Sequence, residues 1–248
     1  MTMSADTIQN ALQCVAQFRQ QHASDLPLAK AVVQVKRFQA RRFQATYADL
    51  LHDPRYSGAA RFFLEELYSE RDYTSRDQQF ARIASTIARL FPKSVLDTAA
   101  ALAEVHALTE TLDHRMGQIW CADALAQPQA SEAARYVHCW RQSGDRAARE
   151  KQLRIVLQLG QQLDHLTHAR GLRSLLKMMR RPASAAGLDA LQQFLETGFD
   201  AFAQMGSAQT FLARVQQRES EWIRCLFDDD AVSCATQLNH LMAANVVQ

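Results

Sequence analysis

The chain has 248 residues, of which 48% are apolar and 22% charged, with a net charge of +2 and a pI near 8.3. A chain of this size can bury a core of its own without a disulfide or a metal. A charge so close to zero argues against nucleic acid as a partner. The five cysteines form no CxxC pair, which favours reduced thiols and a cytoplasmic location.

Two further absences narrow the class of protein. No stretch of about 18 uncharged apolar residues occurs, so we expect no membrane span and no membrane partner. The first residues lack a basic segment followed by an apolar one, which argues against a secretory leader. The chain is therefore expected to be a soluble protein.

Turn-forming residues are scarce. The chain holds 8 Gly and 5 Pro, whereas about 30 would be average for this length. A β-rich protein needs many more tight turns, and the abundant Ala, Leu, Gln, Arg and Glu are good helix formers. We therefore predict an all-α fold, a multi-helix bundle of about nine to eleven helices without a sheet.

In the first half, apolar residues recur at helical spacing and the breaks are marked by proline. Asp25-Leu26-Pro27 ends one helix and starts another, because proline is tolerated in a first turn. Thr74 to Asp77 has the spacing of a capping box. The expected helices are 5–22, 26–51, 58–68, 74–90 and 94–126.

In the second half, Pro128, Gly144, Pro182 and Gly206 mark the breaks. The core is expected to come from the helices at 94–126, 145–168 and 188–227. Residues 1–248 are interpreted as a single helical domain, with 126–131 as the place where two lobes would meet. The expected helices here are 131–142, 145–168, 172–179, 188–205, 207–227 and a last one reaching about 244.

The stretch from Arg61 to Asp77 (RFFLEELYSERDYTSRD) is the most unusual in the chain. Its apolar residues form one broad helical face, and Arg61 precedes Glu65 by the four residues that suit an ion pair. One interpretation is a buried short helix tied to its neighbours by its charges. The other is a functional groove or partner-docking face. Its candidate polar groups are Glu65, Glu66, Tyr68, Asp72 and Arg76, with His106 or Asp113 added from the long helix.

Residues 62–68 (FFLEELY), followed by Arg76 and Asp77, resemble the signature of uncharacterised bacterial FFLEELY-motif proteins. Residues 175–183 (LLKMMRRPA) and 194–199 (FLETGF) are similar to motifs of the same family. The resemblance is compatible with an all-helical chain of this length. It implies no reaction, so no catalytic residue follows from it.

Patterns for metal or cofactor chemistry are weak. The long helix holds Glu110 and His114 on one face, but no glutamate is followed three residues later by histidine, as a di-iron bundle requires. A single axial histidine for haem is conceivable at His106, His114 or His138. Neither HExxH nor GxSxG nor a phosphate-binding glycine loop occurs. We predict no catalytic residue, no metal ligand and no cofactor.

Two basic stretches, 36–42 and 170–181, are interpreted as exposed helix faces, with phosphate or an acidic partner as the alternative. Without a catalytic pattern, the sequence favours a non-enzymatic interaction or scaffold protein with an unknown protein partner. The alternative is a helical small-ligand-binding protein or enzyme with a pocket near residues 61–77.

Overall fold

A computed structural model describes residues 3–67, 71, 73–90 and 93–244 of the chain. In this part the fold is all-α, with twelve helices and no strand. The helices are α1 (Met3–Ser24), α2 (Leu26–Thr46), α3 (Ala48–His52), α4 (Ser57–Leu67), α5 (Thr74–Leu90), α6 (Lys93–Ala126), α7 (Glu132–Ser143), α8 (Arg146–Thr167), α9 (Leu172–Ala185), α10 (Asp189–Met205), α11 (Gln209–Asp228) and α12 (Ala231–Ala244).

Local signals set several boundaries as predicted. Asp25 caps α2, accepting a hydrogen bond from the Leu28 amide at 3.0 Å. Ser131 caps α7 in the same way. Gly144 ends α7 with φ of 63°, a left-handed conformation that glycine adopts at no steric cost. These boundaries depend only on neighbouring residues, which is why they can be predicted from the sequence.

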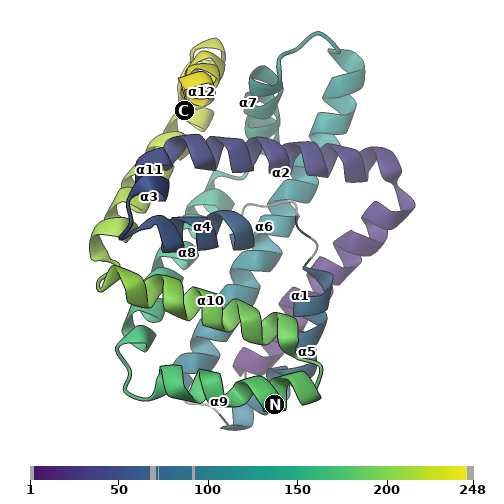
Figure 1. Cartoon of the computed structure of the whole chain (residues 1–248). Helices are drawn as coiled ribbons and strands as arrows, with labels where there is room; N and C mark the ends of the chain where they lie inside the picture. The colour runs from purple at the N-terminus through teal and green to yellow at the C-terminus, as the bar shows by residue number, and fades with distance from the viewer. Residues whose placement is uncertain (1–2, 68–70, 72, 91–92, 245–248) are drawn as a thin grey trace.

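The longest helix, α6, runs through the middle of the molecule, with α1 along it and α2 across it (Figure 1). Helices α10 and α9 lie one beneath the other at the opposite end from α12. A Cβ added at Gly117 of α6 would stand 2.4 Å from a methyl carbon of Val32 in α2. The missing side chain is therefore what lets α2 cross α6 so closely.

Two clusters of buried apolar side chains form the core. The first joins α1, α2, α3, α4, α5, α6, α8, α10 and α11, and the second joins α2, α6, α7, α11 and α12. Leu153 of α8 packs against both. The predicted core helices all contribute, but α1, α2, α4 and α7 contribute as well, so the expected core was too small. No helix in the described residues combines the length and apolarity needed to cross a bilayer.

The predicted helix 26–51 is in fact two helices, which is one reason the count exceeds nine to eleven. The break falls at Tyr47, where φ is −115° and ψ is 22°. Arg218 donates to the Thr46 carbonyl at 2.9 Å, and the Tyr47 hydroxyl donates to Glu219 at 2.9 Å. These contacts come from α11, so the break at Tyr47 cannot be predicted from residues 26–51 alone.

The predicted end of a helix at residues 180–182 is also wrong. Helix α9 continues through Pro182 to Ala185. Proline removes one backbone donor, leaving the carbonyl of Met178 without its helical partner. Met178 is 68% exposed, so this turn lies on the solvent side of the helix, where water can replace a lost backbone hydrogen bond.

Candidate functional site

One face of α6 carries a row of buried polar side chains. His106, Glu110, Asp113 and His114 are all less than 9% exposed, and their spacing places them along one side of the helix. This side packs against α1 and α2. A buried polar group is costly without a partner, so the geometry of this polar seam depends on what α1, α2 and α5 provide.

At one end of the seam, Asp77 of α5 joins three cationic or imidazole groups. It accepts from Arg19, from Arg76 at 3.2 Å and from His106 Nε2 at 2.9 Å. Burial alone would raise the pKa of Asp77. The hydrogen bond and charge of His106, with the charge of Arg76, outweigh burial and lower the pKa to about 2. Asp77 is thus a permanent carboxylate that holds α1, α5 and α6 together.

Arg76 connects this end to the FFLEELY segment. It pairs with Glu66 at 2.6 Å, and its guanidinium carbon lies 4.2 Å from the ring centre of Tyr73 and 4.9 Å from that of Phe194. The Tyr73 hydroxyl donates to the carbonyl of Glu65. The end of α4 is therefore fixed to the start of α5 and to α10 by a guanidinium stacked between two aromatic rings.

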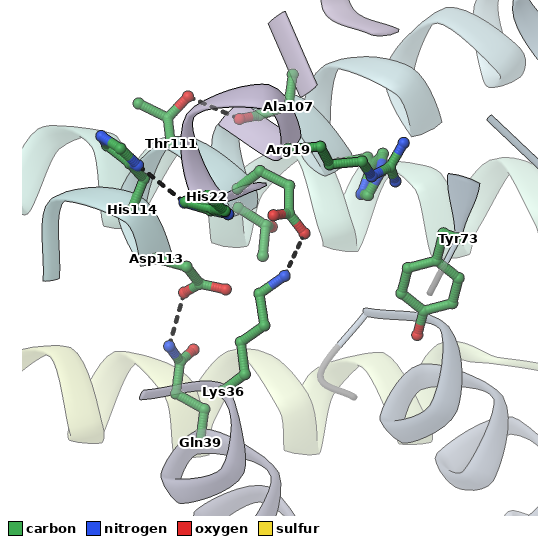
Figure 2. A network of polar contacts seen from close by, with 12 residues as sticks. Arg19, His22, Lys36, Gln39, Tyr73, Ala107, Thr111, Asp113 and His114 are labelled. Atoms are coloured by element: carbon green, nitrogen blue, oxygen red, sulfur yellow. Dashed lines mark hydrogen bonds and ion pairs between the residues drawn. The ribbon is translucent and has the colours of Figure 1, made fainter. Parts of the chain in front are cut away.

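Further along the seam, α2 supplies the partners of two acids. Lys36 Nζ lies 2.6 Å from a Glu110 oxygen, and Gln39 donates to Asp113 at 2.7 Å (Figure 2). Burial would raise the pKa of Glu110, but the charge and hydrogen bond of Lys36, together with the charges of His106 and Arg19, outweigh burial and lower the pKa. Burial raises the pKa of Asp113, whose closest polar partner is a neutral amide. The two acids thus differ in the charge of their partners.

At the far end, His22 of α1 meets His114 of α6 with 3.0 Å between ring nitrogens (Figure 2). Burial lowers the pKa of both residues, and the neighbouring charge of His114 lowers that of His22 further. One ring must then donate while the other accepts. The contact therefore holds two neutral imidazoles together.

The charged groups of the seam pair mainly with one another. Asp77, which accepts from three donors, has little capacity left to act as a base. Within the described residues, no group of three or more His, Cys, Asp or Glu side chains is arranged to hold a metal ion.

A groove lies on the other side of the FFLEELY segment. It offers about 720 Å³ between α2, α3, α4, α12 and the start of α7. Figure 1 shows α2 passing between α12 and the pair α3 and α4. Apolar and charged side chains share its walls. The lining residues are Phe38, Arg41, Gln44, Ala45, Ala48, Leu51, His52, Arg61, Leu64, Glu65, Glu132, Asn239, Met242 and Ala243.

Some residues of the FFLEELY segment are buried in the core, whereas others, with the preceding Arg61, line this groove. Phe62 and Phe63 are 7% and 3% exposed and pack in the first cluster. Arg61, Leu64 and Glu65 line the groove. The segment is thus a packing element, as the first interpretation of the sequence expects, and it also forms one wall of a surface groove. A functional role for this groove stays a prediction.

The predicted site residues fall into three places. Glu66 and Arg76 lie together with His106 around Asp77, and Glu65 lines the groove. Asp113 lies elsewhere in the seam, on Gln39. Tyr68 and Asp72 are outside the described residues. The expected pair between Arg61 and Glu65 was wrong, because Glu65 pairs with Arg71 at 3.0 Å.

The local pattern around Asp77 predicts only a helix cap, so its central role in the seam was not expected. Nor was the match between Lys36 and Gln39 on α2 and Glu110 and Asp113 on α6. Both pairs are three residues apart in the sequence. This equal spacing is the one signal that could have linked the two helices.

Comparison with known proteins gives one match. No curated protein and no solved structure is significantly similar to the chain. A family model described as Domain of unknown function (DUF8198) matches residues 18–233, a range that includes the seam, the FFLEELY segment and most of the groove. The chain therefore belongs to this family.

Proposed function

We propose that the protein is a non-enzymatic interaction protein that binds an amphipathic segment of a partner protein in the groove. The observation that carries this proposal is the position of Arg61, Leu64 and Glu65. They belong to the most unusual segment of the chain, and they line a groove of about 720 Å³.

The lining suits a segment with one apolar and one polar side. Leu51, Leu64 and Met242 offer apolar contact, as a helix-binding groove does for the anchor residues of its partner. Arg61 is exposed and has no ion-pair partner among the described residues. It is therefore available to a carboxylate on the partner.

The wall that carries these residues is rigid. Phe62 and Phe63 fix α4 to the core, and the ion pair between Glu66 and Arg76 fixes its end. A preformed wall lowers the entropy lost on binding. The buried polar seam contributes here by holding the helices that support the groove, without taking part in any reaction.

The setting we infer is the cytosol. All five cysteines are free thiols, which suits a reducing compartment. From the resemblance to FFLEELY-motif proteins we also infer a bacterial origin.

Photo-crosslinking from inside the groove tests the proposal. A photoreactive amino acid replaces Met242 or His52 in the groove and, as a control, Val232 on an exposed part of α12. We expect the same partner to be crosslinked from both groove positions in cells and not from position 232. Arg61→Glu should abolish this product, while Leu195→Asp on α10 should leave it unchanged.

Identical products from position 232, or a product indifferent to Arg61→Glu and Leu64→Asp in folded protein, would reject the groove as a docking site. Thermal unfolding of each variant establishes that it is folded. Arg61 is fully on the surface, so its replacement gives a result even if Leu64→Asp destabilises α4.

A small ligand is the second candidate, because the groove volume falls within the range of about 300–1,000 Å³ typical of ligand pockets. A thermal-shift screen of small amphipathic acids distinguishes it. A ligand that stabilises the wild type but not Arg61→Glu would favour this function over partner binding.

A further inference from the structure

The turn between α11 and α12 brings two buried cysteines together. Cys225 lies in the last turn of α11 and Cys234 in the first turn of α12, and they are 4% and 0% exposed. Their sulfur atoms are 2.7 Å apart. The two sulfurs are in direct contact but farther apart than the about 2.05 Å of a disulfide bond, and both residues are free thiols.

The backbone around both cysteines is fixed by helix caps. The Asp229 amide donates to the Cys225 carbonyl at 3.3 Å and ends α11. Asp230 caps α12, accepting from the Ser233 amide at 2.9 Å, and its carbonyl accepts from the Cys234 amide at 2.9 Å. The turn therefore holds the two thiols next to each other, and joining the sulfurs requires only a small movement.

We propose that Cys225 and Cys234 form a reversible dithiol–disulfide site that is oxidised by a low-molecular-weight disulfide such as glutathione disulfide. One cysteine, as the thiolate, attacks the disulfide and releases one glutathione thiolate. The second cysteine then attacks the mixed disulfide, forms the Cys225–Cys234 bond and releases the other. Two protein thiols are oxidised, one glutathione disulfide is reduced to two thiols, and the two protons go to the leaving thiolates.

The surroundings of the pair make the exchange slow. Burial raises the pKa of both thiols, so little thiolate exists in the closed structure. A glutathione molecule reaches them only when the first turn of α12 opens, next to the exposed residue Ala231. The site therefore responds to sustained oxidation rather than to a brief exposure.

Oxidation also affects a wall of the groove. Helix α12 supplies Asn239, Met242 and Ala243 to it, and the new bond would fix α12 to α11. This consequence for binding rests on the proposed function. The modification site itself does not, because its test below uses no partner and leaves the groove untouched.

Disulfide mapping of the wild-type protein provides the test. The purified full-length protein is incubated with glutathione disulfide under native conditions, its remaining thiols are alkylated, and its peptides are analysed by mass spectrometry. We expect a peptide pair joined through Cys225 and Cys234. The oxidised protein should also unfold about 5–10 °C higher, as expected for closing a loop of this size, and reduction should reverse the shift.

Matched variants assign the shift to the pair. Cys225→Ala should show no oxidant-dependent shift, whereas Cys121→Ala should keep it, because Cys121 lies on α6 and is half-buried. Thiols at 225 and 234 that stay reduced after prolonged incubation, or glutathione adducts that never resolve into the link, would overturn the proposal. The wild-type mapping gives this result even if an alanine variant fails to fold.

Discussion

The ring of Phe62 in α4 lies against the bare backbone of Gly198 in α10. A Cβ added at Gly198 would stand 2.8 Å from Cζ of Phe62, and the Phe62 ring also packs on Phe194 with 5.4 Å between centres. The FFLEELY and FLETGF segments, which the sequence singled out separately, therefore meet. The third such segment joins them, because Arg180 of α9 pairs with Glu196 at 2.6 Å.

We predict that Gly198→Ala destabilises the fold. Overpacking a core typically costs about 1–3 kcal/mol, whereas alanine in a helix gains about 1 kcal/mol over glycine, so the clash should win. Chemical denaturation measures the change. Phe62→Leu in the same chain should recover part of the loss, since it removes the atoms that the new methyl meets.

Gly58→Ala is the matched control. A Cβ there would come closest to the end of the Gln204 side chain, at 3.2 Å, where a flexible group can shift by a few tenths of an ångström. Its next neighbour, Ala201, would be at an ordinary contact distance of 3.6 Å. We expect Gly58→Ala to leave the free energy of unfolding within about 1 kcal/mol of the wild type. Equal losses at both glycines would mean that the contact between Phe62 and Gly198 is not what limits position 198.

A second prediction concerns the buried pair of Arg42 and Glu219. The two terminal guanidinium nitrogens of Arg42, Nη1 and Nη2, donate to Glu219 at 3.1 and 2.9 Å, and Arg42 is 2% exposed. Removing one charge of a buried pair leaves the other charge buried without a counter-ion. We expect Glu219→Gln to lower the free energy of unfolding by about 3–5 kcal/mol.

The exposed pair of Arg41 and Glu132 provides the comparison, since both side chains are about half exposed. Glu132→Gln should cost less than about 1 kcal/mol, because water screens the pair. Urea unfolding of the two variants side by side decides the matter. If both variants lose a similar free energy of unfolding, burial does not make the ion pair of Arg42 more important for stability than the exposed pair.

The sequence determined the fold class and most helix boundaries because these depend on local chemistry. Asp25, Ser131 and Gly144 act within a few residues of themselves. The break at Tyr47 depends on contacts from α11, and the continuation of α9 through Pro182 depends on solvent exposure. The local sequence pattern therefore predicted both positions wrongly. The same limit applies to the seam. Its polar residues on α6 were recognised, but their partners lie far away in the chain.

A third prediction follows from the pKa of Asp77. In the folded protein this pKa is about 2, below the ordinary value of 3.8. A depressed acid pKa contributes stability that is fully present above the unfolded value and is lost as the pH falls from about 4 to 2. The size of this contribution is about 2 kcal/mol. Denaturant unfolding at a series of pH values should show this loss.

Asp77→Asn should remove that pH dependence. The variant lacks the charge that Arg19, Arg76 and His106 surround, so it should be less stable near neutral pH. Its free energy of unfolding should also vary less between pH 4 and 2. A variant as pH-dependent as the wild type in this range would indicate that other carboxylates dominate the acid response.

The contact between His22 and His114 leads to the last prediction. Burial lowers the pKa of both residues below the ordinary value of 6.5. A base with a lowered pKa in the folded state stabilises the fold above its unfolded pKa, and this contribution is lost as the pH falls below 6.5. The charge of Glu110 opposes the shift of His22 and that of Lys36 supports it, so the loss reflects their sum.

We therefore expect α1 to loosen from α6 in mild acid, because protonating both rings places two cations 3.0 Å apart. Amide hydrogen exchange of α1 at pH 7 and pH 5.5 measures this. His114→Gln should reduce the difference between the two pH values, since glutamine can hydrogen-bond to His22 without becoming charged. His240→Gln on the exposed side of α12 should leave the difference unchanged. If α1 exchanges equally at both pH values in the wild type, the imidazole contact does not control its docking.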